Sequence, residues 1–424
     1  MFLESENASR ERLIASLNHQ QPDRIPIDFG GTSTSGVHVS CVAALRDHYG
    51  LEKRPVRVHE PFQMLGMLDE DLLDAMGVDV VGAFGRTTMF GFPAEEWKPW
   101  RLNGLEILVP KDFSTTVDAQ GNTLIYPEGD LNAPPSGRMP NGGYFFDCII
   151  RQESFDEENL NPEDNMEEFG PISQEDLDHL ARVTKAAAAT GRGVIATLGG
   201  LALGDIALVP APNLKHPKGI RDVTEWYVST SSRQDYIHKI FARQCEIGIQ
   251  NLERVYAAIG DSVQAVFVCG TDFGTQNSAF CSVKTFQNLY LPYYRQITHW
   301  IHANTSWKTF KHSCGAVCKF LPSFVDAGID ILNPVQCSAT GMDPEQLKAT
   351  YGDRITFWGG GVDTQRVLPF GTPAEVREQV LRRCEIFAPG GGFVFNSIHN
   401  VQAATPAENI VAMIDAVHEF NGRG

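Results

Sequence analysis

An imidazole and a thiol stand two residues apart in the stretch His312-Ser313-Cys314-Gly315. The run before them, residues 305–311, favours a β-strand, in which residues i and i+2 point to the same side. Both side chains can then bind one metal ion, and a thiolate with an imidazole suits zinc. The pair alone leaves one alternative open, a buried cysteine beside a hydrogen-bonded histidine.

The elements that must position this pair form a regular pattern. Eight runs have the composition of β-strands, at residues 24–29, 77–84, 193–198, 263–269, 307–313, 329–335, 355–358 and 392–397. Helical patterns accompany them at residues 10–19, 233–259, 283–303, 319–327, 344–351, 373–387 and 406–420. The alternation predicts an α/β fold of parallel βα units, and eight units predict a closed (β/α)8 TIM barrel. A doubly wound open sheet is the alternative.

One segment, residues 101–164, departs from this pattern. It contains the turn signals Asn103-Gly104 and Asn141-Gly142-Gly143, and its alternating residues 105–110 and 123–126 predict short antiparallel hairpins. We therefore expect one barrel domain over residues 1–424, with an inserted β-hairpin subdomain after the second strand. The insertion either forms a lid over the carboxyl-end face of the barrel or is an inert elaboration.

Polar side chains follow most of the predicted strands, at the barrel end where such folds carry their chemistry. These residues are Asp28, Asp272, Gln276, His312, Cys314, Gln336, Asp363 and His399. We predict that His312, Cys314 and His399 bind zinc and leave a fourth position open for catalysis. For His399 a purely structural role is the alternative.

The remaining rim residues are predicted to act on the substrate. Asp272, Gln276 and Asp28 are expected to orient it or to donate a proton. Gln336 and Asp363 are expected to bind it, and Asp363 is also a candidate fourth metal ligand. Cys318 and Cys337 stay open as alternative thiols.

The composition narrows the classes of partner. The 424 residues include 35 Lys and Arg against 52 Asp and Glu, a net charge of −17 that disfavours nucleic acid or an anionic membrane as partner. No run of about 18 apolar residues predicts a membrane span, and residues 1–12 are too polar for a signal peptide. Nine cysteines without a pairing pattern indicate reduced thiols. We expect a cytoplasmic protein.

Several blocks together resemble the uroporphyrinogen decarboxylase superfamily, and within it the corrinoid-dependent methyltransferase branch. The blocks cover residues 10–12, 22–26, 272–276, 312–315, 333–336, 341–344, 360–364 and 405–410. The resemblance implies a zinc enzyme whose partner is a separate corrinoid-binding protein that carries cobalamin. The decarboxylase itself is disfavoured, because residues 28–33 lack the arginine of its first loop, where a substrate with many carboxylates needs a cation.

The third ligand departs from the branch that methylates thiols. Those relatives use a His-x-Cys pair and a later cysteine, but here His399 occupies the place of that cysteine, six residues before Thr405. An imidazole in place of a thiolate leaves zinc more Lewis acidic, which suits an oxygen-bound methyl group. The carboxylate, carboxylate, histidine pattern described for O-demethylating members is matched loosely by Asp363, Glu378 and His399. Glu378 falls in the middle of a predicted helix and is not expected to reach the site.

We therefore expect an O-demethylase-type methyltransferase. It would move a methyl group from a small methylated substrate, such as an aromatic methyl ether, to the cobalt of the corrinoid protein. The alternatives are transfer from a methylcorrinoid to a thiol or folate, and a zinc-free uroporphyrinogen decarboxylase-like lyase or binding protein. A homodimer is the default expectation for the assembly.

Overall fold

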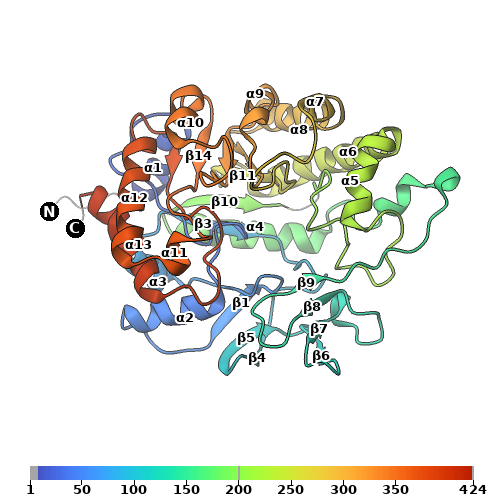
Figure 1. Cartoon of the computed structure of the whole chain (residues 1–424), viewed down its shortest axis with the longest axis horizontal. Helices are drawn as coiled ribbons and strands as arrows, with labels where there is room; N and C mark the ends of the chain where they lie inside the picture. Colours follow the sequence, from blue (N-terminus) through green and yellow to red (C-terminus); the bar gives the residue numbers. More distant parts are fainter. Residues whose placement is uncertain (1–7, 199–200, 423–424) are drawn as a thin grey trace.

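The structure, a computed structural model, describes residues 8–198 and 201–422. Its centre is a parallel seven-stranded sheet in the order β15 (Phe393–Val394), β14 (Thr356–Trp358), β13 (Ile331–Asn333), β12 (Lys308–His312), β11 (Ala265–Cys269), β10 (Gly193–Thr197) and β3 (Val80–Phe84). Ile27 forms a bridge to Phe395 and Asp28 forms one to Val80, so one segment touches both ends of the sheet. This mixed α/β fold is consistent with a TIM-like barrel (Figure 1).

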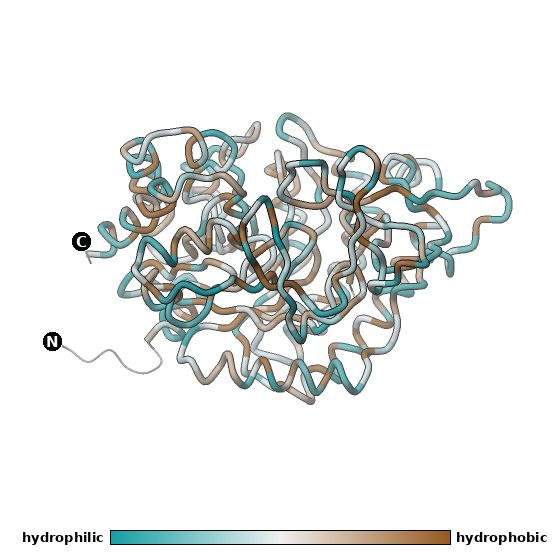
Figure 2. The backbone as a smooth tube through the Cα atoms, turned by 90° about the horizontal axis from the view of Figure 1, so that it is seen from below, coloured by the Kyte–Doolittle hydropathy of each residue, from teal (hydrophilic) through white to brown (hydrophobic). Residues whose placement is uncertain are grey.

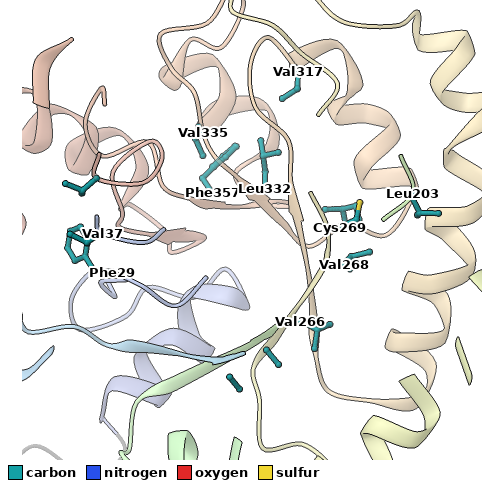
Figure 3. Packing of buried hydrophobic residues seen from close by; sticks show 14 of the residues in the cluster. Phe29, Val37, Leu203, Val266, Val268, Cys269, Val317, Leu332, Val335 and Phe357 are labelled. Atoms are coloured by element: carbon teal, nitrogen blue, oxygen red, sulfur yellow. The ribbon is translucent and has the colours of Figure 1, made fainter. Parts of the chain in front are cut away.

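The inner face of the sheet is one apolar cluster. Each of the seven strands contributes one side chain to it, and helix α1 (Ala8–Leu17) adds Leu13 and Leu17. The strand residues are Val80, Ile195, Ala265, Phe310, Ile331, Trp358 and Val394. Because strand side chains alternate between faces, the neighbouring residues Val266, Leu332 and Phe357 belong to the other cluster of buried side chains (Figure 3). The alternation also determines which later residues point into the barrel.

Seven of the eight predicted strands lie where the apolar runs indicated, although most are shorter than predicted. The first, residues 24–29, forms only isolated bridges and no regular strand. Pro26 lies within this run and has no N–H to donate to a neighbouring strand, although its carbonyl accepts from the N–H of Phe395 (2.8 Å). The ladder therefore stays short at this point.

Helices surround the sheet and occupy most of the predicted stretches. They are α2 (Val39–His48), α3 (Glu70–Met76), α4 (Gln174–Ala189), α5 (Val223–Ser232), α6 (Gln234–Ile259), α7 (Val283–Leu289), α8 (Leu291–Asn304), α9 (Leu321–Asp326), α10 (Pro344–Tyr351), α11 (Val367–Phe370), α12 (Pro373–Phe387) and α13 (Ala407–Phe420). The single helix predicted over 283–303 is wrong, because it is two helices that meet at Tyr290. Pro292 in the first turn of α8 lacks the N–H that a continuous helix would need there.

A β-rich part, formed by two strands that precede β3 in the chain and six that lie between β3 and α4, packs to one side of the main sheet (Figure 1). One sheet has the order β2 (Leu65–Gly66), β1 (Val56–Glu60), β5 (Leu105–Pro110) and β4 (Trp97–Leu102). The other has the order β6 (Thr115–Val117), β7 (Thr123–Ile125), β8 (Gly137–Met139) and β9 (Asp147–Cys148). Strand β1, which pairs with β5, precedes the predicted insertion and was not anticipated.

Hydrophilic and hydrophobic residues alternate along the backbone tube (Figure 2). In the part of the chain that the structure describes, no helix has the length and apolar character needed to cross a membrane.

Candidate metal centre

Three side chains converge at the carboxyl ends of the strands. His312 ends β12, Cys314 follows two residues later, and His399 lies in the loop after β15. One ligand atom from each lies within 4.8 Å of the others. Cys314 Sγ is 3.3 Å from His312 Nε2, and the two imidazole rings are 5.3 Å apart. The three residues that were predicted to share one site therefore lie close together, while metal binding stays a prediction.

The strand period explains the direction of His312. Phe310 contributes to the inner cluster of the barrel, so His312, two residues later, points to the same inner side at the open end. Its exposed fraction is only 5%. This candidate ligand is thus held at the end of a strand and not in a loop.

Asn333 fixes the orientation of the His312 ring, and the sequence had not singled it out as a functional residue. Its Nδ2 donates to the carbonyl of Trp358 (2.9 Å), which identifies Oδ1 as the acceptor for His312 Nδ1 (2.7 Å). Thr34 Oγ1 donates to the same oxygen (2.9 Å). His312 therefore carries its proton on Nδ1 and directs the Nε2 lone pair toward Cys314, as in metal sites whose outer partners orient the ligands. The available signal was its position two residues after Ile331 on the inner face of β13.

Asp272 lies against the cluster from the loop after β11. Its Oδ1 accepts from the backbone N–H of Cys314 (2.6 Å) and is 3.9 Å from His312 Nε2. Burial raises the pKa of Asp272. This predicted catalytic residue is thus brought into the site, where it holds the loop that presents the thiol.

Burial sets the protonation states of the three candidate ligands. It lowers the pKa of His312 to about 4 and that of His399 to about 4, so both imidazoles are neutral at pH 7 and keep a lone pair. Burial raises the pKa of Cys314 well above its ordinary value, so the free thiol keeps its proton. A metal ion bound here would have to displace that proton, as thiolate ligands require.

The hydrogen bonds of His399 favour metal coordination less than those of His312 do. The backbone N–H of Asn400 donates to His399 Nδ1 (2.8 Å), which places the proton of the neutral ring on Nε2. Coordination through Nε2 requires that this proton move to Nδ1 and that the Asn400 bond be given up. Coordination through Nδ1 requires only the second change. With one thiol and two imidazoles, the donor set fits zinc.

Two predicted site residues, Gln276 and Gln336, are linked to each other. Gln336 accepts from the N–H of Gly315 (2.7 Å) and donates to Gln276 Oε1 (2.8 Å), while Gln276 Nε2 donates to the carbonyl of Ser338 (2.5 Å). Both ends of each amide are therefore engaged. The pair braces the loop that carries Cys314, and direct roles in catalysis and substrate binding stay predictions.

Asp28 and Asp363 also have structural partners. Asp28 is fully buried and accepts from the N–H of Gly31 and from Trp358 Nε1, both at 2.8 Å, and burial raises its pKa to about 6. Asp363 accepts from the N–H of Gln365 (2.7 Å) and Arg366 (3.2 Å) at the start of α11. Neither belongs to the three-residue group found among the described residues.

The alternative ligands lie elsewhere. Cys318 and Cys337 pack against the apolar core, and Glu378 lines a surface groove on α12 together with Arg382. The loose fit of Glu378 to a ligand pattern is therefore not realised, because a mid-helix position between β14 and β15 directs it outward.

This chain is similar to known proteins in sequence and in structure. Residues 160–420 match the family described as Uroporphyrinogen decarboxylase (URO-D). The uroporphyrinogen decarboxylases of Alkalilimnicola ehrlichii and Psychromonas ingrahamii are 33% identical over 91 residues and 34% identical over 89 residues. Each match covers 20% of this chain and 24% of the relative, so it spans about a quarter of the length of these proteins.

A solved structure titled methyltransferase from Methanosarcina mazei has a similar fold. It superposes with a TM-score of 0.54 at 14% identity, over 97% of this chain and 98% of that one. The likeness extends along the whole chain, including the part that precedes the family match.

Proposed function

This chain belongs to the uroporphyrinogen decarboxylase family, and from that premise we propose that it is a zinc- and corrinoid-dependent methyltransferase of the O-demethylase type. It would take a methyl group from a small methylated substrate, such as an aromatic methyl ether, and pass it to the cobalt of a separate corrinoid-binding protein. One observation carries the proposal: His312, Cys314 and His399 place their ligand atoms within 4.8 Å of one another at the open end of the sheet. The fold shared with the methanosarcinal methyltransferase supports it.

We infer that the sheet is a closed (β/α)8 barrel, with residues 24–29 in the place of the eighth strand. The bridges from Ile27 and Asp28 to opposite ends of the sheet support this inference. Residues 101–164 would then be an inserted subdomain of a single-domain chain.

His312, Cys314 and His399 would hold zinc, which when bound supplies a Lewis acid for the oxygen of the substrate. The reduced corrinoid of the partner protein would supply the electron pair that accepts the methyl group, while the donor oxygen would keep the electron pair of the broken C–O bond and take up a proton. Asn333 keeps the Nε2 lone pair of His312 directed at the site, and the Cys314 loop is held by Asp272. We propose that Asp272 also orients the substrate.

The other rim residues would act from further away. Gln276 and Gln336 would keep the Cys314 loop in place, and Asp28 would support the floor of the site through Trp358. Asp363 lies in the loop after β14 and stays a candidate substrate-binding residue. The corrinoid protein would dock at the same open end, and the assembly of this chain is proposed to be a homodimer.

Zinc content tests the centre directly. Wild-type protein is expected to hold one zinc per chain, and His312→Ala, Cys314→Ser and His399→Ala are expected to lose it. Cys337→Ser is the matched control, because this thiol packs against the core and not in the cluster, and it should keep its zinc. Zinc-free wild-type protein, or full zinc in the His399→Ala variant, would contradict the proposed ligand set.

The direction of transfer needs a second assay. Reduced corrinoid protein with a methyl ether is expected to form methylcobalamin, followed by its absorbance. Formation of a thioether or methylfolate from methylcobalamin would instead identify the reverse half-reaction. Release of carbon dioxide from a porphyrinogen would identify a decarboxylase.

A further inference from the structure

A large cavity lies between the main sheet and the β-rich part. Its volume is about 830 Å³, within the range of small-molecule sites. Strands β3 and β10 and helix α4 line one side of it, and strands β1 and β4 line the other. None of His312, Cys314 and His399 lines this cavity, so its ligand is considered separately from the metal centre.

The arginines of the lining already have carboxylate partners. Arg86 and Arg182 both pair with Glu95, at 3.1 Å and 3.2 Å. Arg57 pairs with Asp69, and the lining contains no lysine. The cavity therefore offers an anionic ligand no guanidinium group that lacks a carboxylate partner.

The buried carboxyl group of Glu60, by contrast, has no cation partner. Its exposed fraction is 8%, and its oxygens accept from the backbone N–H groups of Phe62 (2.9 Å) and Gln63 (2.8 Å). Within the part of the chain that the structure describes, no lysine, arginine or histidine forms an ion pair with it, and burial raises its pKa to about 7. Each carboxylate oxygen can accept a further hydrogen bond. A cation that enters the cavity would therefore stabilise the ionised form of Glu60.

The other ionisable groups of the lining do not offset this charge. Burial lowers the pKa of His59 to about 4, so its ring is neutral at pH 7. Asp176 on α4 is a second lining carboxylate without a cation partner among the described residues, and it accepts from Ser173 Oγ (2.6 Å). Glu168 is paired with Arg221 (2.7 Å). The lining thus has an excess of negative charge, which attracts a positively charged ligand.

The rest of the lining includes apolar surface that can hold the body of an organic molecule. Met67, Phe84, Met89 and Trp97 all contribute to it. The cavity is also far larger than a single metal ion requires, since one water molecule occupies only about 30 Å³ of liquid volume. These features favour an organic cation over an inorganic one.

We infer that this cavity binds a small organic cation, a protonated primary amine on an apolar body, whose ammonium group donates to the carboxylate of Glu60. A buried carboxylate is stabilised best by a partner that carries the opposite charge and also donates hydrogen bonds, which a quaternary ammonium group cannot do. The apolar body packs against Phe84 and Met67. The inference goes beyond the proposed function and requires neither zinc nor methyl transfer.

Three ligands of matched shape test the charge of the ligand. Calorimetric titration of the wild-type protein compares 2-phenylethylamine with 2-phenylethanol and phenylacetate. At pH 8 the amine is protonated, because alkylamines have a pKa of about 10, and Glu60 is mostly ionised. The amine is expected to bind at least about tenfold more tightly than the alcohol, as one charge-assisted hydrogen bond implies, and phenylacetate is expected not to bind.

Variants test the assignment to Glu60. Glu60→Gln removes the charge with little change in shape and is expected to weaken amine binding about 10–100-fold, while binding of the alcohol changes by less than about threefold. Asp178→Asn is the matched control, because it removes the same charge from an exposed position of α4 that does not line the cavity, and it should leave amine binding unchanged. Thermal melting shows whether each variant is folded.

Each contrary outcome contradicts a stated part of the inference. Equal affinities for the amine and the alcohol, or undetectable binding of the amine, would overturn the assigned ligand class. A loss in Asp176→Asn as large as that in Glu60→Gln would overturn the assignment of the ammonium group to Glu60. The comparison of the three ligands uses wild-type protein only, so it decides the charge of the ligand even where Glu60→Gln does not fold.

Discussion

Replacing Asn333 by alanine tests whether this buried amide prepares the metal centre. Asn333 is fully buried and makes three hydrogen bonds, to His312 Nδ1, Thr34 Oγ1 and the carbonyl of Trp358. The change leaves the His312 N–H and the Trp358 carbonyl without this partner. At about 1–3 kcal/mol for each unsatisfied buried group, the free energy of unfolding should fall by about 2–6 kcal/mol.

The same change should weaken zinc binding, because the His312 ring loses the acceptor that fixes its tautomer. Loss of an outer partner of a ligating histidine typically costs about 10–100-fold in metal affinity, equivalent to about 1.4–2.8 kcal/mol. Competition with a chromophoric chelator measures the affinity, and circular dichroism confirms that the variant is folded.

Two further variants separate affinity from stability. Asn333→Asp keeps an acceptor for His312 but loses the donor to Trp358, so it should be less stable yet bind zinc nearly as wild type does. Thr34→Val removes the other donor to the same oxygen and should leave zinc affinity within about threefold, since the His312 bond remains. Wild-type affinity in folded Asn333→Ala, or an equal loss in Thr34→Val, would refute the reasoning.

Two other changes give expected results of known direction. Gly315→Ala should displace the Cys314 loop and lower zinc affinity, because φ of Gly315 is +85° and an added Cβ would lie 2.4 Å from Gly274. Gly142→Ala is the control, because φ of Gly142 is +73° but the space around it is open, and this variant should leave zinc affinity unchanged. Equal zinc affinities in the two alanine variants would contradict this. In metal-free protein, burial lowers the pKa of His399 to about 4, below its unfolded value of about 6.5. The neutral buried ring therefore contributes to stability above about pH 6.5, and this contribution is lost as the pH falls toward 4. The side chain of the His399→Asn variant cannot be protonated, so the urea midpoint of this variant should fall less than that of wild type between pH 7 and pH 5. Equal falls in the two midpoints would show that His399 does not titrate in this way.

Local sequence patterns were sufficient for most of the secondary structure. Apolar runs located seven strands, and α10 and α12 begin and end at the predicted residues. Both helices begin with proline after a capping Asp343 or Thr372, a signal that is local and therefore readable. The break at Tyr290 was missed, although Pro292 marks it. Strand β1 was also missed, because its pairing with β5 links residues about fifty positions apart.

The sequence by itself determined the types of the metal-competent residues and their places at strand ends. His312 and Cys314 stand two residues apart, and strand geometry alone puts them on one side. Only the tertiary structure decided that His399 joins them, that Asn333 orients His312, and that Gln276 and Gln336 are engaged with each other. The physical reason is that these contacts cross between strands and loops far apart in the chain, where curvature of the sheet, and not local spacing, determines which side chains meet.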